Sequence, residues 1–110
     1  MPKYITFFSY TRESAKAMME RPSDRTAAAG ALVESVGGKM EAFYWMHGNH
    51  DGFIIGSYPD GASAAALATA AASTGAIAQT ETHEIFDRDA QTQIMKAAKT
   101  AVGVYKPPTA

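Results

Sequence analysis

The chain has no cysteine among its 110 residues. Disulfides, thiolate metal sites and a cysteine nucleophile are therefore excluded. It also lacks an excess of charge of one sign, because ten lysines and arginines are scattered among eleven aspartates and glutamates. Proteins that bind nucleic acids carry a clustered basic surplus, so the composition argues against a nucleic-acid partner. No Ser-His-Asp arrangement, P-loop or GxGxxG motif stands in the sequence, and nothing in it identifies a cofactor.

Long hydrophobic runs are absent as well. The alanine-rich stretch 62–72 is too short and too weakly apolar to span a bilayer. The N-terminus leads from Met1 and Pro2 directly into an alternating segment, which is unlike a signal peptide. We therefore expect a cytoplasmic protein without a membrane partner. Hydrophobic residues still make up 46% of the chain, enough for one packed domain, which we place at residues 1–104 with an extended tail over 105–110.

Four stretches have the alternation and the β-branched and aromatic content of strands, over residues 3–10, 39–47, 53–58 and 77–86. In the first, Tyr4, Phe8 and Tyr10 share one face, and Ile5 and Phe7 share the other. Apolar residues on both faces predict a central strand that is covered on two sides. Strict alternation in the second stretch predicts one face made of Met40, Ala42, Tyr44 and Met46, opposite Phe43, Trp45 and His47.

The first helical region is predicted as two pieces. Thr11 is placed to cap the first piece, because its hydroxyl can accept an amide proton from the first helical turn. Pro22 breaks or bends the helix, since proline has no amide proton and clashes with the preceding turn. Ser23 or Asp24 can cap the continuation, and the pair at 37–38, both glycine, ends it.

Two further helices follow from the same signals. Asp60 can cap an alanine-rich helix over residues 62–73, and Gly75 is placed to stop it. Its small side chains allow the helix to lie close to a sheet. Asp87 or Asp89 can start a last helix that carries Ile94, Ala98 and Val102 on one side.

The order β-α-β-β-α-β followed by an extra helix predicts a ferredoxin-like α+β sandwich. With helices on one face of the sheet, the other face carries about half of the apolar strand residues. Such a surface is a large exposed patch unless a second copy covers it, so the pattern predicts a homodimer. In this topology the strands at 39–47 and 77–86 lie apart. The tip of the hairpin is therefore expected to meet the last strand only across a dimer contact or a bend.

Several short motifs make the chain resemble the GYD-domain family of small bacterial proteins, which belongs with the dimeric α+β barrels. The resemblance covers nearly the whole chain and rests on Tyr10-Thr11, Gly37-Gly38-Lys39, Phe43-Tyr44-Trp45, Pro59-Asp60 and Thr80-Glu81-Thr82. The motif that names the family falls at Gly48-Asn49-His50-Asp51, where His50 stands in the place usually taken by tyrosine. The resemblance implies the fold and a dimer, and it supplies no function.

One cluster of reactive side chains surrounds the predicted hairpin turn. His47, His50 and Asp51 could bind a metal ion, since imidazoles and a carboxylate form common three-ligand sites. Glu81 and His83 share a face of the last strand and could add to such a site. The alternative interpretation is structural, with the histidines as turn residues and Asp51 bonded to a turn amide.

A second set of residues predicts a pocket between sheet and helices. Its candidate ligand-binding residues are Thr6, Tyr10, Met18, Tyr44, Trp45 and Thr82. Aromatic and methionine side chains form either an apolar ligand site or an ordinary core. A small apolar or aromatic molecule is the ligand class that such a pocket implies.

Three functions are compatible with these residues. The first is a module that binds a small molecule in the pocket between sheet and helices. The second is a cofactor-independent oxygenase or isomerase, in which His83 or Tyr44 acts as an acid–base group. The third is a structural component of a larger homo-oligomer.

Overall fold

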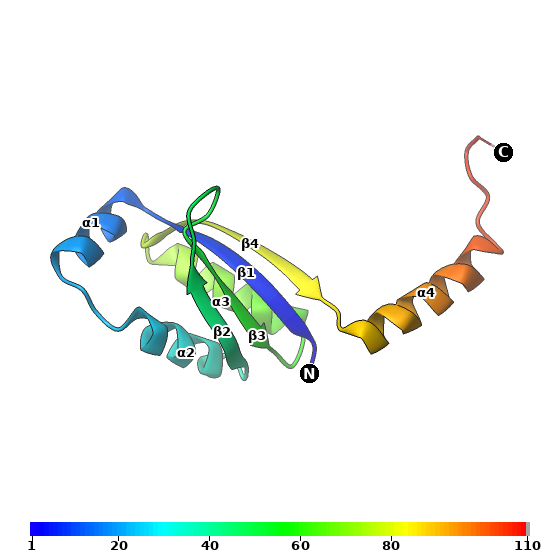
Figure 1. The fold of residues 1–110 in the computed structure, drawn as a ribbon, viewed down its shortest axis with the longest axis horizontal. Helices are drawn as coiled ribbons and strands as arrows, with labels where there is room; N and C mark the ends of the chain where they lie inside the picture. The colour runs from blue at the N-terminus through cyan, green and yellow to red at the C-terminus, as the bar shows by residue number, and fades with distance from the viewer. Residues whose placement is uncertain (110) are drawn as a thin grey trace.

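A computed structural model describes residues 1–109 of the chain. One four-stranded antiparallel sheet has the order β2-β3-β1-β4 (Figure 1). Its strands are β1 (Lys3–Tyr10), β2 (Lys39–Trp45), β3 (Gly52–Ser57) and β4 (Ile77–Ile85). The helices are α1 (Arg12–Glu20), α2 (Arg25–Ser35), α3 (Gly61–Ser73) and α4 (Arg88–Val102). The predicted order of elements and the α+β fold with ferredoxin-like topology are thus confirmed.

Each helix begins at a side chain that caps its first turn. Thr11, Asp24, Asp60 and Asp87 each accept a hydrogen bond from the amide three residues later. Such a cap satisfies one of the amides that the first turn leaves without a partner. The joint between α1 and α2 falls at residues 21–24 and contains Pro22, so the two-piece prediction is confirmed.

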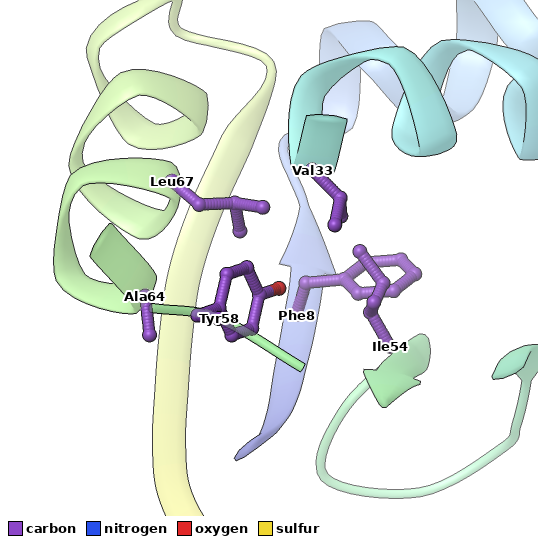
Figure 2. Close-up of a cluster of buried hydrophobic side chains, with 6 residues drawn as sticks. All are labelled: Phe8, Val33, Ile54, Tyr58, Ala64 and Leu67. Carbon is purple, nitrogen blue, oxygen red and sulfur yellow. The ribbon is translucent and has the colours of Figure 1, made fainter. Parts of the chain in front are cut away.

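The core lies where α2 and α3 cover the sheet. Figure 2 shows Val33 of α2 and Leu67 of α3 extending toward each other above Phe8 of β1 and Ile54 of β3. Tyr58, in the connection from β3 to α3, fills the space beside them and is fully buried. This packing holds the helices on one face of the sheet.

Two glycines make room for the Tyr58 ring. A Cβ atom added to Gly38 would lie 2.6 Å from Cδ1 of that ring, and one added to Gly56 would lie 2.8 Å from its hydroxyl oxygen. These approaches are closer than carbon atoms tolerate, so any larger residue at either position would displace the ring. The glycines are needed for close packing.

A β-bulge overturns one prediction about β2. Met40 pairs with Gly56 while Ala42 pairs with Ile55, so two residues of β2 oppose one step of β3. The bulge shifts the alternation by one residue. Met40 therefore packs against the core, and the prediction that it shares a face with Ala42 and Tyr44 is wrong.

The far face of the sheet carries a second aromatic cluster. The Phe7 ring lies 6.0 Å from that of Phe53 and 5.4 Å from that of His50, and Tyr44 lies 5.7 Å from Phe53. None of these residues contributes to the buried core. We call the surface formed by Ile5, Phe7, Tyr44, Phe53 and Ile55 the open sheet face.

The last helix stands apart from this body. Figure 1 shows α4 continuing beyond the C-terminal end of β4 and away from the sheet. None of the residues Arg88–Val102 is buried, and Val102 is 74% exposed. Within residues 1–109, no helix combines the length and the apolar character that a membrane span requires.

Candidate functional site

A cavity of about 420 Å³ lies between the sheet and helices α1, α2 and α3. Its floor comes from the strand residues Thr6, Phe8, Tyr10, Phe43, Ile54, Ile77 and Thr80. The walls come from α1 and α2 on one side and from α3 on the other, including Met18, Leu32, Leu67, Ala68 and Ala71. We call this space the sheet–helix cavity.

The structure places three of the six predicted ligand-binding residues in the sheet–helix cavity. Thr6, Tyr10 and Met18 line it directly. Thr82 is behind this lining and shares a hydrogen bond of 3.1 Å with the hydroxyl of Thr6. Trp45 is also outside the lining, and its Nε1 donates a hydrogen bond of 3.2 Å to the Tyr10 hydroxyl. Tyr44 lies on the opposite face of the sheet, against Phe53.

Polar groups in the lining are oriented by neighbours outside it. Because the Tyr10 oxygen accepts from Trp45, its own proton is free to donate to a ligand. Ser14 is in a similar position, since its Oγ accepts a hydrogen bond of 3.1 Å from the Thr11 hydroxyl. The lining therefore offers hydrogen-bond donors among mostly apolar side chains, which is the composition of small-molecule sites.

Sequence reasoning missed most of the cavity wall. The sequence predicts that the small side chains of α3, Ala68 and Ala71 among them, bring this helix close to the sheet, whereas these two residues line the cavity beside it. Arg21, Ser23 and Arg25 at the joint between α1 and α2 also line the cavity. The bend at Pro22 was the available signal, because a chain that turns there brings the flanking residues to one place.

Both predicted acid–base residues lie on the open sheet face. The His83 ring is 6.4 Å from that of Phe7, and its Nε2 is 2.7 Å from Oε2 of Glu81. The hydrogen bond with His83 is the main cause that lowers the pKa of the Glu81 carboxyl, and His50 adds to the effect. Tyr44 is 62% exposed on the same face. Neither Tyr44 nor His83 contacts the sheet–helix cavity.

The three predicted metal ligands point to different partners. The His50 ring stacks on Phe7, and its Nδ1 lies 3.2 Å from the Ser9 hydroxyl. Asp51 accepts a hydrogen bond of 2.8 Å from the Tyr10 amide. His47 is exposed beside Asp51 at a smaller hollow next to Trp45. In residues 1–109, no three histidine, aspartate or glutamate side chains gather in an arrangement that could hold a metal ion.

The hairpin loop reaches the last strand within one chain. His50 Nε2 lies 3.8 Å from Oε1 of Glu81. β3 pairs with β1, and β1 pairs with β4, so a residue at the start of β3 is one strand away from β4. Strand β2 is separated from β4, as expected, but the hairpin loop that carries His50 is not. The contact between this loop and β4 therefore forms within one chain and needs no second copy.

Comparison with known proteins agrees with the fold. The family model described as the GYD domain matches residues 4–95, which include β2, β3, β4, α1, α2 and α3 in full and all of β1 except Lys3. A search of curated proteins finds no match.

Proposed function

The chain belongs to the GYD domain family, and from that premise we propose that it is a binding protein for a small apolar or aromatic molecule. The observation that carries this proposal is the sheet–helix cavity. Its volume of about 420 Å³ falls within the range of about 300–1,000 Å³ that is usual for ligand pockets. Phe8, Ile54 and Leu67 form an apolar inner end that would bury such a ligand.

Binding is better supported than turnover. An acid–base reaction needs a proton donor or acceptor within hydrogen-bond reach of the substrate. His83 and Tyr44 lie across the sheet from the cavity, so neither would meet a molecule bound there. The titratable side chains of the lining are Tyr10, Arg21 and Arg25, and a phenol and two guanidinium groups make poor bases at neutral pH.

A titration with N-phenyl-1-naphthylamine, an uncharged fluorescent probe for apolar sites, tests this function. We expect saturable binding of one probe per chain. Ala71→Trp places an indole in the cavity and should weaken binding at least about tenfold, because the space is filled. Ala70→Trp is the matched control, since Ala70 is exposed on α3 and does not line the cavity. Absence of saturable binding, or equal binding by both variants, would contradict the proposal.

The open sheet face supports a homodimer as the working form. Its five side chains lie on the two central strands β1 and β3 and on the edge strand β2, and no helix covers this face. Contiguous apolar patches of this kind usually mark an interaction surface. A second copy, related by a two-fold axis, would pair this face with itself.

Sedimentation velocity measures that association directly. Tyr44→Glu puts a charge into the face and should shift the protein from dimer to monomer at micromolar concentration. Ala70→Glu, on the exposed side of α3, should leave the dimer intact. A wild-type protein that sediments as a monomer would refute the dimer, and a discrete larger oligomer would favour an assembly role.

A further inference from the structure

The charged groups of the sheet–helix cavity have one sign. Arg21 and Arg25 are the charged residues of its lining, which contains no aspartate or glutamate. They stand at the end of α1 and the start of α2, on the two sides of the Pro22 joint. Neither has an ion-pair partner within residues 1–109. Guanidinium groups stay charged at every physiological pH, so this rim is permanently positive.

Two of the uncharged polar groups of the lining, on Tyr10 and Ser14, have the same preference. The hydroxyls of Tyr10 and Ser14 each accept a hydrogen bond from a neighbour and keep a proton to donate. Arginine side chains are donors without acceptor capacity. A cavity that presents hydrogen-bond donors and positive charge beside an apolar floor is complementary to a ligand with an apolar part and a negatively charged hydrogen-bond acceptor.

We propose that the ligand is an apolar carboxylic acid, whose ring or chain lies over Phe8 and Ile54 and whose carboxylate is held by Arg21 and Arg25. This inference rests on the proposed binding function and specifies its ligand class. Guanidinium and carboxylate groups form paired hydrogen bonds that are stronger than those between neutral groups. Arg21 and Arg25 are exposed to solvent whereas Phe8 and Ile54 are buried, so a ligand would enter with its apolar end first.

A pair of probes with the same ring system separates charge from shape. Calorimetric titrations compare 2-naphthoate with 2-naphthalenemethanol, and we expect the acid to bind at least about tenfold more tightly. The double variant Arg21→Gln/Arg25→Gln should reduce the affinity for the acid to that for the alcohol and leave the alcohol unchanged. Arg12→Gln is the control, since Arg12 is an exposed arginine of α1 outside the lining.

The outcomes distinguish this inference from the function on which it rests. An acid that binds no more tightly than the alcohol, or does not bind, overturns the carboxylate proposal. If N-phenyl-1-naphthylamine still binds and Ala71→Trp still blocks its binding, the proposed binding function stands even though the carboxylate proposal is wrong. If all three compounds fail to bind, both proposals fall.

A different feature, helix α4, supports a second inference. Its polar residues occupy one side of the helix and its apolar residues the other, with Gln91 as the exception. The apolar side consists of Ala90, Ile94, Met95, Ala97, Ala98, Ala101 and Val102. An isolated helix of 15 residues is marginal in water, and an amphipathic one gains its stability by covering its apolar side.

The charges indicate what covers it. Residues 88–110 carry four basic and one acidic side chain, whereas residues 1–87 carry six basic and ten acidic ones. The C-terminal arm is thus basic and the body acidic. Within one chain α4 projects away from that body, so the complementary surface that it can reach belongs to another molecule.

We infer that α4 of one copy packs its apolar side against the body of a second copy, with Arg88 and Lys99, which border that side, close to acidic groups of that body. The exposed side chains of Phe86 and Tyr105, at the two ends of the helix, would be buried in the same contact. Exchange of an arm between two copies is a common route to a symmetric dimer. The tail at 105–109 would then lie along the partner.

Two charge insertions on α4 test the contact. Ala98→Glu lies on the apolar side and should weaken self-association at least about tenfold in sedimentation equilibrium. Thr100→Glu lies on the polar side of the same turn and should leave it unchanged. Because the chain has no cysteine, Ala98→Cys can also be cross-linked to a lysine of the partner without background. A monomeric wild type, equal effects of the two glutamates, or cross-links only within one chain would overturn the inference.

Discussion

Trp45 donates a hydrogen bond of 3.2 Å from its indole Nε1 to the hydroxyl oxygen of Tyr10. Trp45 lies outside the sheet–helix cavity and Tyr10 lines it. The bond fixes the direction of the phenol proton, so a residue outside the cavity determines how the cavity presents a donor. It also links the single tryptophan of the chain to the binding site, which makes Trp45 fluorescence a natural reporter of occupancy.

Loss of the Trp45 donor should weaken ligand binding without disturbing the fold. We expect Trp45→Phe to reduce the affinity for 2-naphthoate about two- to tenfold, because one hydrogen bond contributes about 0.5–1.5 kcal/mol. Calorimetric titration measures this change. Tyr44→Phe, on the other face of the sheet, is the control and should bind as the wild type does. Equal affinities of wild type and Trp45→Phe would show that the orientation of Tyr10 is irrelevant.

Gly38→Ala should destabilise the protein. The added methyl group would lie 2.6 Å from the Tyr58 ring, and forced overpacking typically costs about 1–3 kcal/mol. Urea denaturation gives the free energy of unfolding. Gly30→Ala is the matched control, because its Cβ would meet Met40 at an ordinary 3.6 Å. Alanine is favoured over glycine in a helix by about 1 kcal/mol, so this variant should be as stable as the wild type or more stable. A loss of stability in Gly30→Ala, or none in Gly38→Ala, would contradict this packing.

Tyr58→Phe should be neutral or stabilising at neutral pH. The Tyr58 hydroxyl is buried and has no hydrogen-bond partner among residues 1–109, and an unsatisfied buried polar group costs about 1–3 kcal/mol. Removing the oxygen removes that cost and leaves the ring packing in place. Thermal and urea unfolding measure the difference. A clear loss of stability would mean that a water molecule or a ligand satisfies the hydroxyl.

The sequence predicts the elements better than it predicts the site. Strand β1 was predicted at its observed bounds, and the caps Thr11 and Asp60 were identified, because alternation and capping are local properties of the chain. The bulge in β2 was not predicted, since it depends on how β2 pairs with β3. The face of the sheet on which Met40 lies is therefore set by strand pairing and not by the local sequence.

The candidate site shows the same division. Thr6 and Tyr10 were assigned to a pocket because they are polar or amphipathic side chains on a strand with a covered face, and both line the cavity. The sequence predicts Tyr44 in that pocket as well, although its neighbour Phe43 is the residue that lines it. Composition identifies an aromatic strand, but the pairing register decides which of two adjacent aromatics faces the helices.

Alkaline pH should reveal the burial of Tyr58. Burial raises the pKa of this phenol above its ordinary value of 10.0. The folded state disfavours the ionised phenol. The contribution of Tyr58 to the free energy of unfolding is therefore fully present below pH 10 and is lost as the pH rises through the pKa of Tyr58 in the folded protein. We expect the urea midpoint of the wild type to fall between pH 9 and 11 more than that of Tyr58→Phe. Parallel losses in the two proteins would show that Tyr58 ionises freely.

At acid pH, Glu81 is the group whose shifted pKa makes stability depend on pH. Its carboxyl accepts a hydrogen bond from His83, and this bond is the main cause that lowers its pKa below the ordinary 4.5. A lowered folded pKa contributes stability that is present above pH 4.5 and is lost as the pH falls through the folded value. Carbon-detected NMR titration should therefore give Glu81 a midpoint below 4.5 in the wild type. In His83→Ala it should rise toward 4.5, while the pKa of Glu41, which is lowered mainly by its hydrogen bond from Ser57, should be the same in both proteins. An unchanged Glu81 midpoint in His83→Ala would mean that the two side chains do not interact in solution.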